Sequence, residues 1–264
     1  MNKKQLYAGI YRGWKMVLDV IFPARCPYCD KVVPFLSQIC PECRNSFVHV
    51  KEPRCLRCGK PIGETEIEFC MDCRRKKHYF AQGRGLYEYS SAAASLYRFK
   101  YAGRREYAEF YSDEMVKHLG DTIRQWNAQV LVPVPIHRSR KHRRGYNQAE
   151  VLATALGRKL DIPVDAGLLK RVKKTVPQKF LDEQERQNNL KKAFKIGHND
   201  VKWKTAIIVD DIYTTGSTID ACASVLLKTG IEKVYYVSVA IGTDQSKQEQ
   251  ELITGTKGGY HERT

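Results

Sequence analysis

Four pairs of cysteines, each with two residues between its members, lie within the first 73 residues of this 264-residue chain. Two thiolates at this spacing can bind one metal ion from a tight turn, and two such pairs complete a tetrahedral zinc shell. The spacing therefore predicts two structural zinc ions. The predicted ligands are Cys26, Cys29, Cys40, Cys43, Cys55, Cys58, Cys70 and Cys73.

A disulfide framework is the alternative use of these cysteines, and it needs an oxidising compartment. The chain shows no secretory signal, so reduced, zinc-bound cysteines are favoured. The short gaps within residues 26–43 and within residues 55–73 favour sequential pairing, one zinc per group, over a cross-braced arrangement. A segment this small is expected to depend on metal for its stability.

The formal net charge is +16, and it falls to roughly +12 once two zinc ions bind eight thiolates. A surplus of this size favours a polyanionic partner, either nucleic acid or a phosphorylated small molecule, although ordinary solubility is the alternative. No segment approaches the ~20 apolar residues of a membrane span. The protein is expected to be cytoplasmic and soluble.

Hydrophobic periodicity divides the chain into four parts. An amphipathic helix is expected within residues 1–25, a double zinc ribbon in 26–77, a larger domain in 78–243 and a polar, disordered tail in 244–264. The larger domain is predicted to be α/β, a parallel sheet covered by helices on both faces, because apolar strands alternate with helices. Strands are predicted at 85–89, 129–133, 205–209 and 233–240, and helices at 92–98, 106–119, 147–160 and 217–229.

The stretch from Ile207 to Thr218 combines a predicted buried strand, two adjacent acids and a small polar loop that leads into a helix. Open parallel sheets bind ligands at the carboxyl ends of their strands. Backbone N–H groups and hydroxyls of such a loop can bind a phosphate at the helix N-terminus. Asp210 and Asp211 repel phosphate, but adjacent carboxylates suit the two hydroxyls of a ribose. The residues predicted to bind phosphate are Thr214, Thr215, Gly216, Ser217 and Thr218.

A cation-rich segment follows the strand predicted at 129–133. Its place beside a ligand-facing strand end favours contact with phosphate or nucleic acid over a solvated charge run. Tyr146 offers a ring for stacking on a base, and neighbouring amides can hydrogen-bond the base. A further segment between Arg171 and Phe194 is interpreted as a hood over the site. The residues predicted to bind DNA or an acceptor are Arg140, Lys141, Arg143, Arg144, Tyr146, Asn147, Gln148, Gln178, Arg186 and Asn189.

The Asp210–Thr218 stretch resembles the signature of type I phosphoribosyltransferases, which bind phosphoribosyl pyrophosphate (PRPP) and Mg²⁺. The resemblance implies that Asp210 and Asp211 hold the ribose hydroxyls and that the loop holds the 5′-phosphate. Thr214 stands where some purine-specific members have an additional Asp, which disfavours purine salvage. The segment that resembles the pyrophosphate loop comprises Pro135, Ile136, His137 and Arg138.

The order of the zinc-binding pairs, the Arg144–Gln148 segment and the Asp210–Thr218 loop resembles the ComF family over about residues 20 to 242. Members of that family carry a double zinc ribbon before a phosphoribosyltransferase-like domain. The resemblance implies a cytoplasmic role in natural transformation. The protein would assist in handling incoming single-stranded DNA, with the ComF helicase and other competence proteins as partners.

Two functions follow from these patterns. The favoured one is a DNA-binding competence accessory protein that retains a PRPP–Mg²⁺ site. The alternative is an active phosphoribosyltransferase that transfers phosphoribosyl from PRPP to an unknown acceptor and releases pyrophosphate. The loop favours a site that still binds ligand, while the lack of an obvious base for a nucleophile leaves the catalytic residues, and turnover itself, open.

Several single residues also carry expectations. Cys222 is predicted to be a small core residue. His49 and His78 are predicted to be surface groups rather than ligands, because eight thiolates already fill two zinc shells. Tyr213, inside the loop, is favoured over Trp203 as a ring that stacks on a base.

Overall fold

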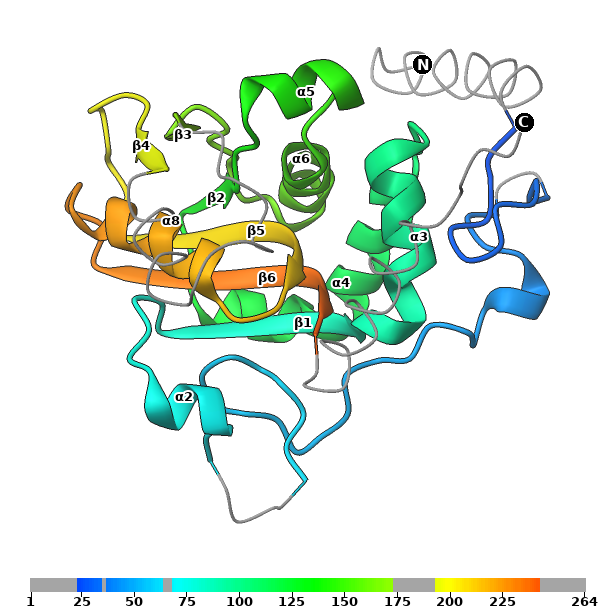
Figure 1. Ribbon diagram of the computed structural model, residues 1–264, viewed down its shortest axis with the longest axis horizontal. Helices are drawn as coiled ribbons and strands as arrows, with labels where there is room; N and C mark the ends of the chain where they lie inside the picture. Colours follow the sequence, from blue (N-terminus) through cyan, green and yellow to red (C-terminus); the bar gives the residue numbers. More distant parts are fainter. Residues whose placement is uncertain (1–22, 35–36, 64–67, 173–192, 243–264) are drawn as a thin grey trace, which may run out of the picture. The chain divides into compact units, whose positions relative to one another are not determined.

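A computed structural model describes residues 23–34, 37–63, 68–172 and 193–242 (Figure 1). The chain forms two compact units, Met1–Phe47 and Val48–Thr264. The predicted N-terminal amphipathic helix, the hood residues 173–192 and the polar tail lie outside the described residues.

The first unit is built around the first four cysteines. Its buried cluster consists of Val33 and three of those cysteines, and the 3₁₀ helix η1, Pro41–Cys43, is the regular element among its described residues. Tyr28 and Phe47 pack edge to face with ring centroids 5.3 Å apart. These few apolar side chains form only a small core. Metal binding would therefore supply much of this unit's stability.

The second unit contains a four-stranded parallel sheet with the order β1-β6-β5-β2 (Figure 1). The central strand β6 is largely apolar and buried, and β5 is apolar and buried from Ala206 to Val209, as strands of a sheet covered on both faces must be. This confirms the predicted α/β class. The strands are β1 Gln82–Glu88, β2 Val130–Pro133, β5 Thr205–Tyr213 and β6 Lys233–Ile241.

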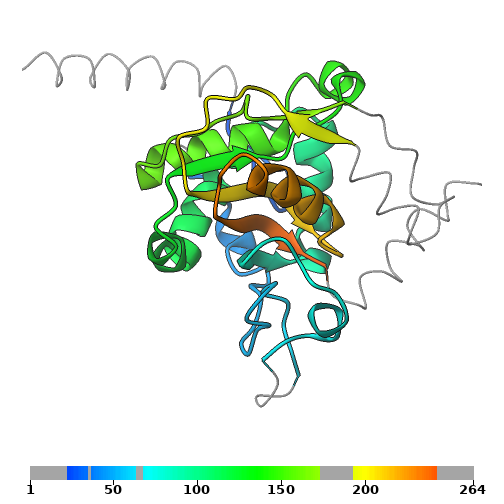
Figure 2. The ribbon, with the colours of Figure 1, turned by 90° about the vertical axis from the view of Figure 1, so that its left-hand side faces the viewer.

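Helices connect the strands and cover the sheet. Helix α4 packs on α6 and β1, and α6 packs on β2 and β5, whereas α8 packs on β5 and β6 (Figure 2). The predicted helices of this unit are all present, with ends shifted by a few residues. Their bounds are α3 Tyr89–Tyr101, α4 Tyr107–Gln125, α6 Gln148–Leu160 and α8 Ser217–Leu227.

A helix and a pair of strands were not among the sequence predictions. The cation-rich run folds into helix α5, Arg138–Arg144, because His137 caps its start and Gly145, with φ 78°, ends it. The strands β3, Leu169–Arg171, and β4, Phe194–Ile196, form an antiparallel pair that α8 contacts. Both elements lie in the second unit.

The second group of four cysteines belongs to the same compact unit as the sheet. Three of these cysteines share a buried apolar cluster with Phe80, Tyr213 and Tyr236. Tyr236 donates a 2.6 Å hydrogen bond from its hydroxyl to the carbonyl of Cys58, and Gly83 donates its N–H to the carbonyl of Arg57. The short helix α2, Met71–Arg75, completes this ribbon. The segment 26–77 is therefore divided between the two units.

Candidate functional site

The carboxyl end of β5 borders a cavity because its neighbour β2 is shorter. β2 pairs with β5 only as far as Pro133 opposite Val209, whereas β6 accompanies β5 as far as Tyr213. Asp210 and Asp211 lie beyond the last β2 pair, where they line a cavity of about 260 Å³. The site thus lies where open parallel sheets bind ligands, at the end of the strands.

The loop between β5 and α8 presents small polar groups toward this cavity. Gly216 caps α8 with φ 76°, and a Cβ there would lie 2.7 Å from the hydroxyl of Tyr213, so the close approach requires glycine. Thr214 and Thr218 line the cavity. The hydroxyls of Thr215 and Ser217 lie 3.0 Å apart in the same loop. The start of α8 adds the positive end of a helix dipole.

The two acids of β5 differ in their electrostatic surroundings. Asp211 forms a 2.6 Å ion pair with Lys100 of α3. Burial alone would raise the pKa of Asp211, but Lys100, the hydrogen bond with Asp210 and the charge of Arg144 together lower it. The pKa of Asp210 is raised well above its ordinary value by burial and by the neighbouring charge of Asp211. The pair therefore combines a firmly ionised carboxylate with one that gains a proton more readily.

Cations from three different elements surround these acids. Four of them line the cavity, and two acids face them, so the site carries a positive surplus that suits a phosphorylated ligand. Burial lowers the pKa of Arg140 and of Arg171, yet guanidinium groups stay charged at neutral pH. The lining cations are Lys100 from α3, Arg140 and Arg144 from α5, and Arg171 from β3.

Arg144 links the cavity to an exposed aromatic pair on α3. Its guanidinium donates to the hydroxyl of Tyr101 at 2.9 Å and lies 4.6 Å from the centroid of that ring. It also donates to the side-chain oxygen of Gln148 at 2.8 Å. Tyr97 lies one turn before Tyr101, and their ring centroids are 5.0 Å apart. The two tyrosines are 57% and 50% exposed, so they form an aromatic surface beside a cation of the cavity.

The structure gives the predicted Tyr146–Gln148 segment internal contacts. Tyr146 is 5% exposed, and its hydroxyl donates to the carbonyl of Phe99. Asn147 caps α6 and donates from its side chain to the carbonyl of Val134 at 3.0 Å. Asn147 and Gln148 also line the cavity. The segment thus forms part of the cavity wall, but the ring of Tyr146 packs inside the protein, so the prediction that it stacks on a base is wrong.

The remaining predicted residues are distributed around this wall. Ile136 lines the cavity, Pro135 is half-buried and His137 caps α5. The exposed cations of α5 are Arg138, Lys141 and Arg143, of which Lys141 pairs with Glu150 at 3.2 Å. Gln178, Arg186 and Asn189 lie outside the described residues.

Sequence patterns missed three contributors to this site. Lys100, Tyr97 and Tyr101 all belong to α3, which the sequence marked only as a helix. Tyrosines four residues apart beside cations could have suggested an exposed aromatic face. Nothing in the sequence indicates that Lys100 meets Asp211, because 110 positions separate the two residues and only the fold brings them together.

Tyr213 was expected to stack on a base, and that prediction is wrong. Its side chain is 2% exposed and its ring stacks on Tyr236, with centroids 4.5 Å apart. Tyr213 belongs to the buried cluster that also contains Phe80, Ile208 and Tyr236. Cys222, predicted as a core residue, is fully buried, which confirms that prediction.

Both groups of four cysteines have the geometry of a metal site. The sulfurs of each group lie within 4.8 Å of one another, which confirms sequential pairing. Four sulfurs about 2.3 Å from a common zinc ion lie roughly 3.8 Å apart. The sulfur separations are 3.7 Å for Cys29–Cys40, 3.6 Å for Cys26–Cys40 and 3.5 Å for Cys58–Cys70. Two tetrahedral zinc ions therefore fit the two clusters.

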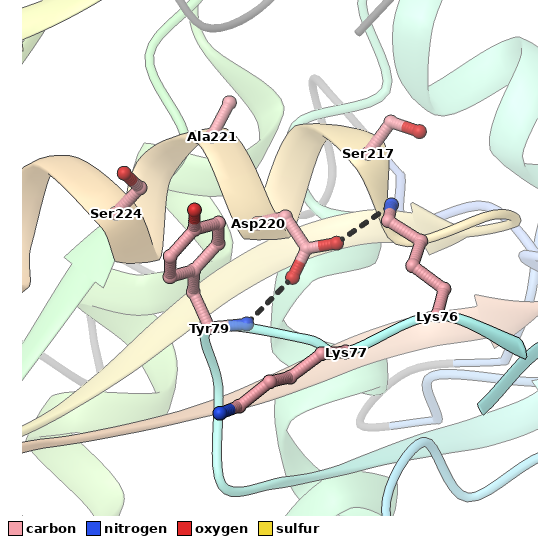
Figure 3. Close-up of a pocket in the computed structure, with 7 residues that line it drawn as sticks. All are labelled: Lys76, Lys77, Tyr79, Ser217, Asp220, Ala221 and Ser224. Carbon is pink, nitrogen blue, oxygen red and sulfur yellow. Dashed lines mark hydrogen bonds and ion pairs between the residues drawn. The ribbon is translucent and has the colours of Figure 1, made fainter. Parts of the chain in front are cut away.

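A buried carboxylate joins the second ribbon to the start of α8 (Figure 3). Asp220 accepts a 3.0 Å hydrogen bond from the N–H of Tyr79, pairs with Lys76 at 2.8 Å and contacts Nδ1 of His78 at 2.8 Å. Asp220, Lys76 and Tyr79 line a second cavity, of about 160 Å³, with Ser217. The contacts connect the chain segment after the second cysteine group to the first turns of α8.

His78 was predicted to be a surface group, and it is instead buried. Its ring stacks on Phe80 with centroids 4.7 Å apart, and Cε1 lies 3.2 Å from the point where a Cβ of Gly216 would stand. Burial alone would raise the pKa of Asp220, but His78 and Lys76 lower it. His78 therefore packs close to Gly216 in the loop between β5 and α8.

Two family models match the chain. One, described as "Double zinc ribbon domain", matches residues 17–74, and the other, "Phosphoribosyl transferase domain", matches residues 142–257. A curated relative named Competence protein F, from Haemophilus influenzae, is 31% identical over 225 residues, covering 76% of this chain and 95% of that protein. The chain belongs to the ComF family.

Two further relatives come from Escherichia coli and Bacillus subtilis. DNA utilization protein YhgH of Escherichia coli K12 is 30% identical over 200 residues, covering 74% of this chain and 87% of that protein. Competence protein ComFC of Bacillus subtilis is 28% identical over 202 residues, covering 74% of this chain and 80% of that protein. The ComF-family architecture of a double zinc ribbon and a phosphoribosyltransferase domain is thus shared with this chain.

Among the described residues, no helix has both the length and the apolar character needed to cross a membrane.

Proposed function

We propose that this protein is a competence accessory protein that handles incoming single-stranded DNA and retains a binding site for PRPP and Mg²⁺. One observation carries the proposal: the acids Asp210 and Asp211 and the Thr214–Thr218 loop border one cation-lined cavity at the end of β5. The relatives named for competence and for DNA utilization support the DNA role.

The cavity has groups for each part of PRPP. The Asp210 and Asp211 carboxylates accept hydrogen bonds from the ribose hydroxyls, and the loop at the start of α8 donates to the 5′-phosphate. Lys100, Arg140 and Arg144 attract the pyrophosphate. Bound Mg²⁺ would neutralise part of the pyrophosphate charge. The positive surplus of the cavity supports this assignment.

Single-stranded DNA has a separate set of groups beside the cavity. The exposed rings of Tyr97 and Tyr101 offer faces on which bases stack, and the exposed Arg138 and Arg143 on α5 attract the backbone. Arg144 connects the two regions, since it contacts Tyr101 and lines the cavity. DNA and PRPP would therefore compete, at least for the space around Arg144.

Active phosphoribosyl transfer is the second candidate, and the raised pKa of Asp210 favours it. A carboxylate with a raised pKa accepts a proton from an incoming nucleophile more readily. In that reaction the nucleophile bonds to the anomeric carbon and its proton passes to Asp210. The bond to pyrophosphate breaks, and its electron pair leaves with pyrophosphate. Release of pyrophosphate with a candidate acceptor would reveal this activity.

The test is a titration of zinc-loaded protein into fluorescently labelled single-stranded DNA, with and without PRPP–Mg²⁺, at several salt concentrations. We expect affinity to fall steeply with salt, by a slope of about 0.7 per backbone phosphate contacted, and to fall further when PRPP is added. DNA binding indifferent to PRPP would place the DNA on another surface. An absence of binding at moderate salt would reject DNA as a direct partner.

Two variants separate charge from stacking in that titration. Tyr97→Ala should lower affinity about tenfold without changing the salt slope, since stacking on an aromatic ring releases no counterions. Arg143→Ala should reduce the slope. The matched controls are Tyr79→Ala, a ring of similar exposure that lines the second cavity, and Arg124→Ala, an exposed cation of α4. If the controls behave like the test variants, the assigned surface is wrong.

A further inference from the structure

Three side chains of types that can bind metals lie together, and none of them belongs to the cysteine clusters or lines the cavity at the end of β5. His49, Glu114 and His118 each offer one ligand atom, and these atoms all lie within 4.8 Å of one another. Nε2 of His49 is 3.8 Å from Oε2 of Glu114, and Nε2 of His118 is 3.5 Å from the same oxygen. All three residues belong to the second compact unit.

Regular backbone structure fixes the positions of these residues. Glu114 and His118 are four residues apart on α4, which places both side chains on one face of that helix. His49 forms a β-bridge with Tyr87 of β1. On either side of His49, Val50 donates its N–H to Leu86 and the carbonyl of Val48 accepts from Glu88. The three ligands are therefore presented by a helix and by a strand-like segment rather than by a free loop.

An ordinary ion pair explains this geometry less well than a metal does. The separations of 3.5 and 3.8 Å exceed the usual length of a hydrogen bond to a carboxylate. Ligand atoms about 2.1 Å from a tetrahedral metal lie roughly 3.4 Å apart, close to these values. The two imidazole rings lie with centroids only 4.0 Å apart, where two positive charges would repel each other.

Electrostatics favours a neutral His49, whose lone pair can bind a metal. Burial lowers the pKa of His49, and the charges of His118, Lys117 and Arg54 lower it further, against the opposing effect of Glu114. Lys117 also lies 3.9 Å from Oε1 of Glu114. Its side chain is largely exposed, so it can move away when a cation binds.

A further residue orients the carboxylate. The hydroxyl of Tyr87 donates a 3.2 Å hydrogen bond to Oε2 of Glu114. Metal sites in proteins typically have such outer hydrogen bonds, which hold a ligand in position before the metal arrives. The side chains of His49, Glu114 and His118 remain partly exposed, so an ion can reach them from solvent.

We propose that His49, Glu114 and His118 form a third metal site, which binds Zn²⁺ or a related divalent transition metal through two imidazoles and one carboxylate. Two nitrogens and one carboxylate oxygen are ligands that zinc accepts, with water in the fourth position. The bound ion would link the segment around His49 to helix α4. That segment follows the first cysteine unit in the sequence.

The test is calorimetric titration of Zn²⁺ into full-length protein whose two cysteine sites are already loaded, with two zinc ions per chain verified by elemental analysis. We expect one further saturable equivalent. His118→Ala and Glu114→Gln should each weaken that third equivalent by at least about tenfold, since even loss of an outer hydrogen bond has an effect of this size. The control is His142→Ala, which removes an exposed histidine of α5.

Glu114→Gln also separates metal binding from a purely structural role. The glutamine oxygen can still accept the hydrogen bond of Tyr87, so the melting temperature without added metal should stay near that of the wild type. Added Zn²⁺ should raise the melting temperature of the wild type but not of this variant. The proposal is overturned if no third equivalent binds. It is equally overturned if the third equivalent survives in both test variants, or if His142→Ala removes it.

Discussion

At the scale of single residues, the two adjacent acids of β5 have opposite effects on stability. Asp211 is ionised against Lys100, whereas Asp210 lies in a buried position beside a like charge. A carboxyl group with a raised pKa in the folded state favours folding below its unfolded pKa, and this contribution is lost as the pH rises through the folded pKa. At neutral pH, ionisation of Asp210 therefore lowers the free energy of unfolding. This is the kind of unfavourable placement expected at a ligand-binding site.

This difference predicts opposite shifts for two single variants. Asp210→Asn should raise the melting temperature at pH 7 by a few degrees, about 2–4 °C for each kcal/mol, because it removes an unfavourable buried charge. The gain should vanish as the pH falls below the ordinary carboxyl pKa of about 3.9, where both folded and unfolded chains are protonated. Asp211→Asn should lower the melting temperature, because it leaves Lys100 unpaired. Thermal unfolding followed by circular dichroism measures both. Equal shifts would contradict the assigned charges.

At the scale of elements, the short helix α5 supplies two of the cations that line the cavity. Helix α5 carries Arg140 and Arg144 into the wall, and its start and end depend on His137 and Gly145. The sequence predicted the alternating strands and helices, because their apolar periodicity is strong. It did not predict α5, since a run of cations has no hydrophobic period. It could not place Lys100, whose partner is distant in the sequence.

The connection between the second ribbon and helix α8 is also an element-scale feature. Asp220 contacts Lys76, His78 and the backbone N–H of Tyr79. His78 in turn lies close to Gly216 in the loop between β5 and α8. A carboxyl group whose pKa is lowered by folding stabilises the protein above its unfolded pKa, and this effect is lost as the pH falls through the lowered value. The second zinc ribbon thereby contributes to the position of the loop.

Asp220→Asn should therefore lower both stability and ligand affinity. The asparagine oxygen can still accept from Tyr79, but the charge that attracts Lys76 and His78 is gone, at a cost of about 1–3 kcal/mol. The difference in melting temperature from the wild type should be present at pH 7 and shrink below about pH 4. Thermal unfolding across pH, together with calorimetry of PRPP–Mg²⁺ binding, tests this. Unchanged affinity in the folded variant would show that the loop is independent of Asp220.

At the scale of the whole molecule, the two zinc sites differ in what depends on them. The first cysteine group forms its own small unit, whereas the second is part of the apolar cluster that includes Phe80 and Tyr236. The four cysteine pairs predicted both sites from sequence, because metal-ligand spacing is a local signal. The sequence could not show that the second cysteine group, unlike the first, shares the core of the sheet-containing unit. That arrangement depends on contacts with β1 and β6, which lie later in the sequence.

Loss of one zinc site should therefore have different consequences from loss of the other. Cys73→Ser should destabilise the entire second unit by several kcal/mol, because its core and its metal shell share side chains. Cys29→Ser should leave the main unfolding transition of the second unit near its wild-type temperature. Calorimetric melting of both variants, with zinc content measured, compares the effects. An equal loss of the main transition in both would contradict the division into two units.

The central claim is that the end of β5 binds PRPP with Mg²⁺, and direct calorimetric titration of zinc-loaded protein tests it most plainly. We expect one Mg²⁺-dependent binding event per chain. It should be abolished by the double variant Asp210→Asn with Asp211→Asn and preserved by Asp121→Asn, a change of an exposed acid on α4. Binding that survives in the folded double variant, or no binding to the wild type, would contradict the assignment of this site.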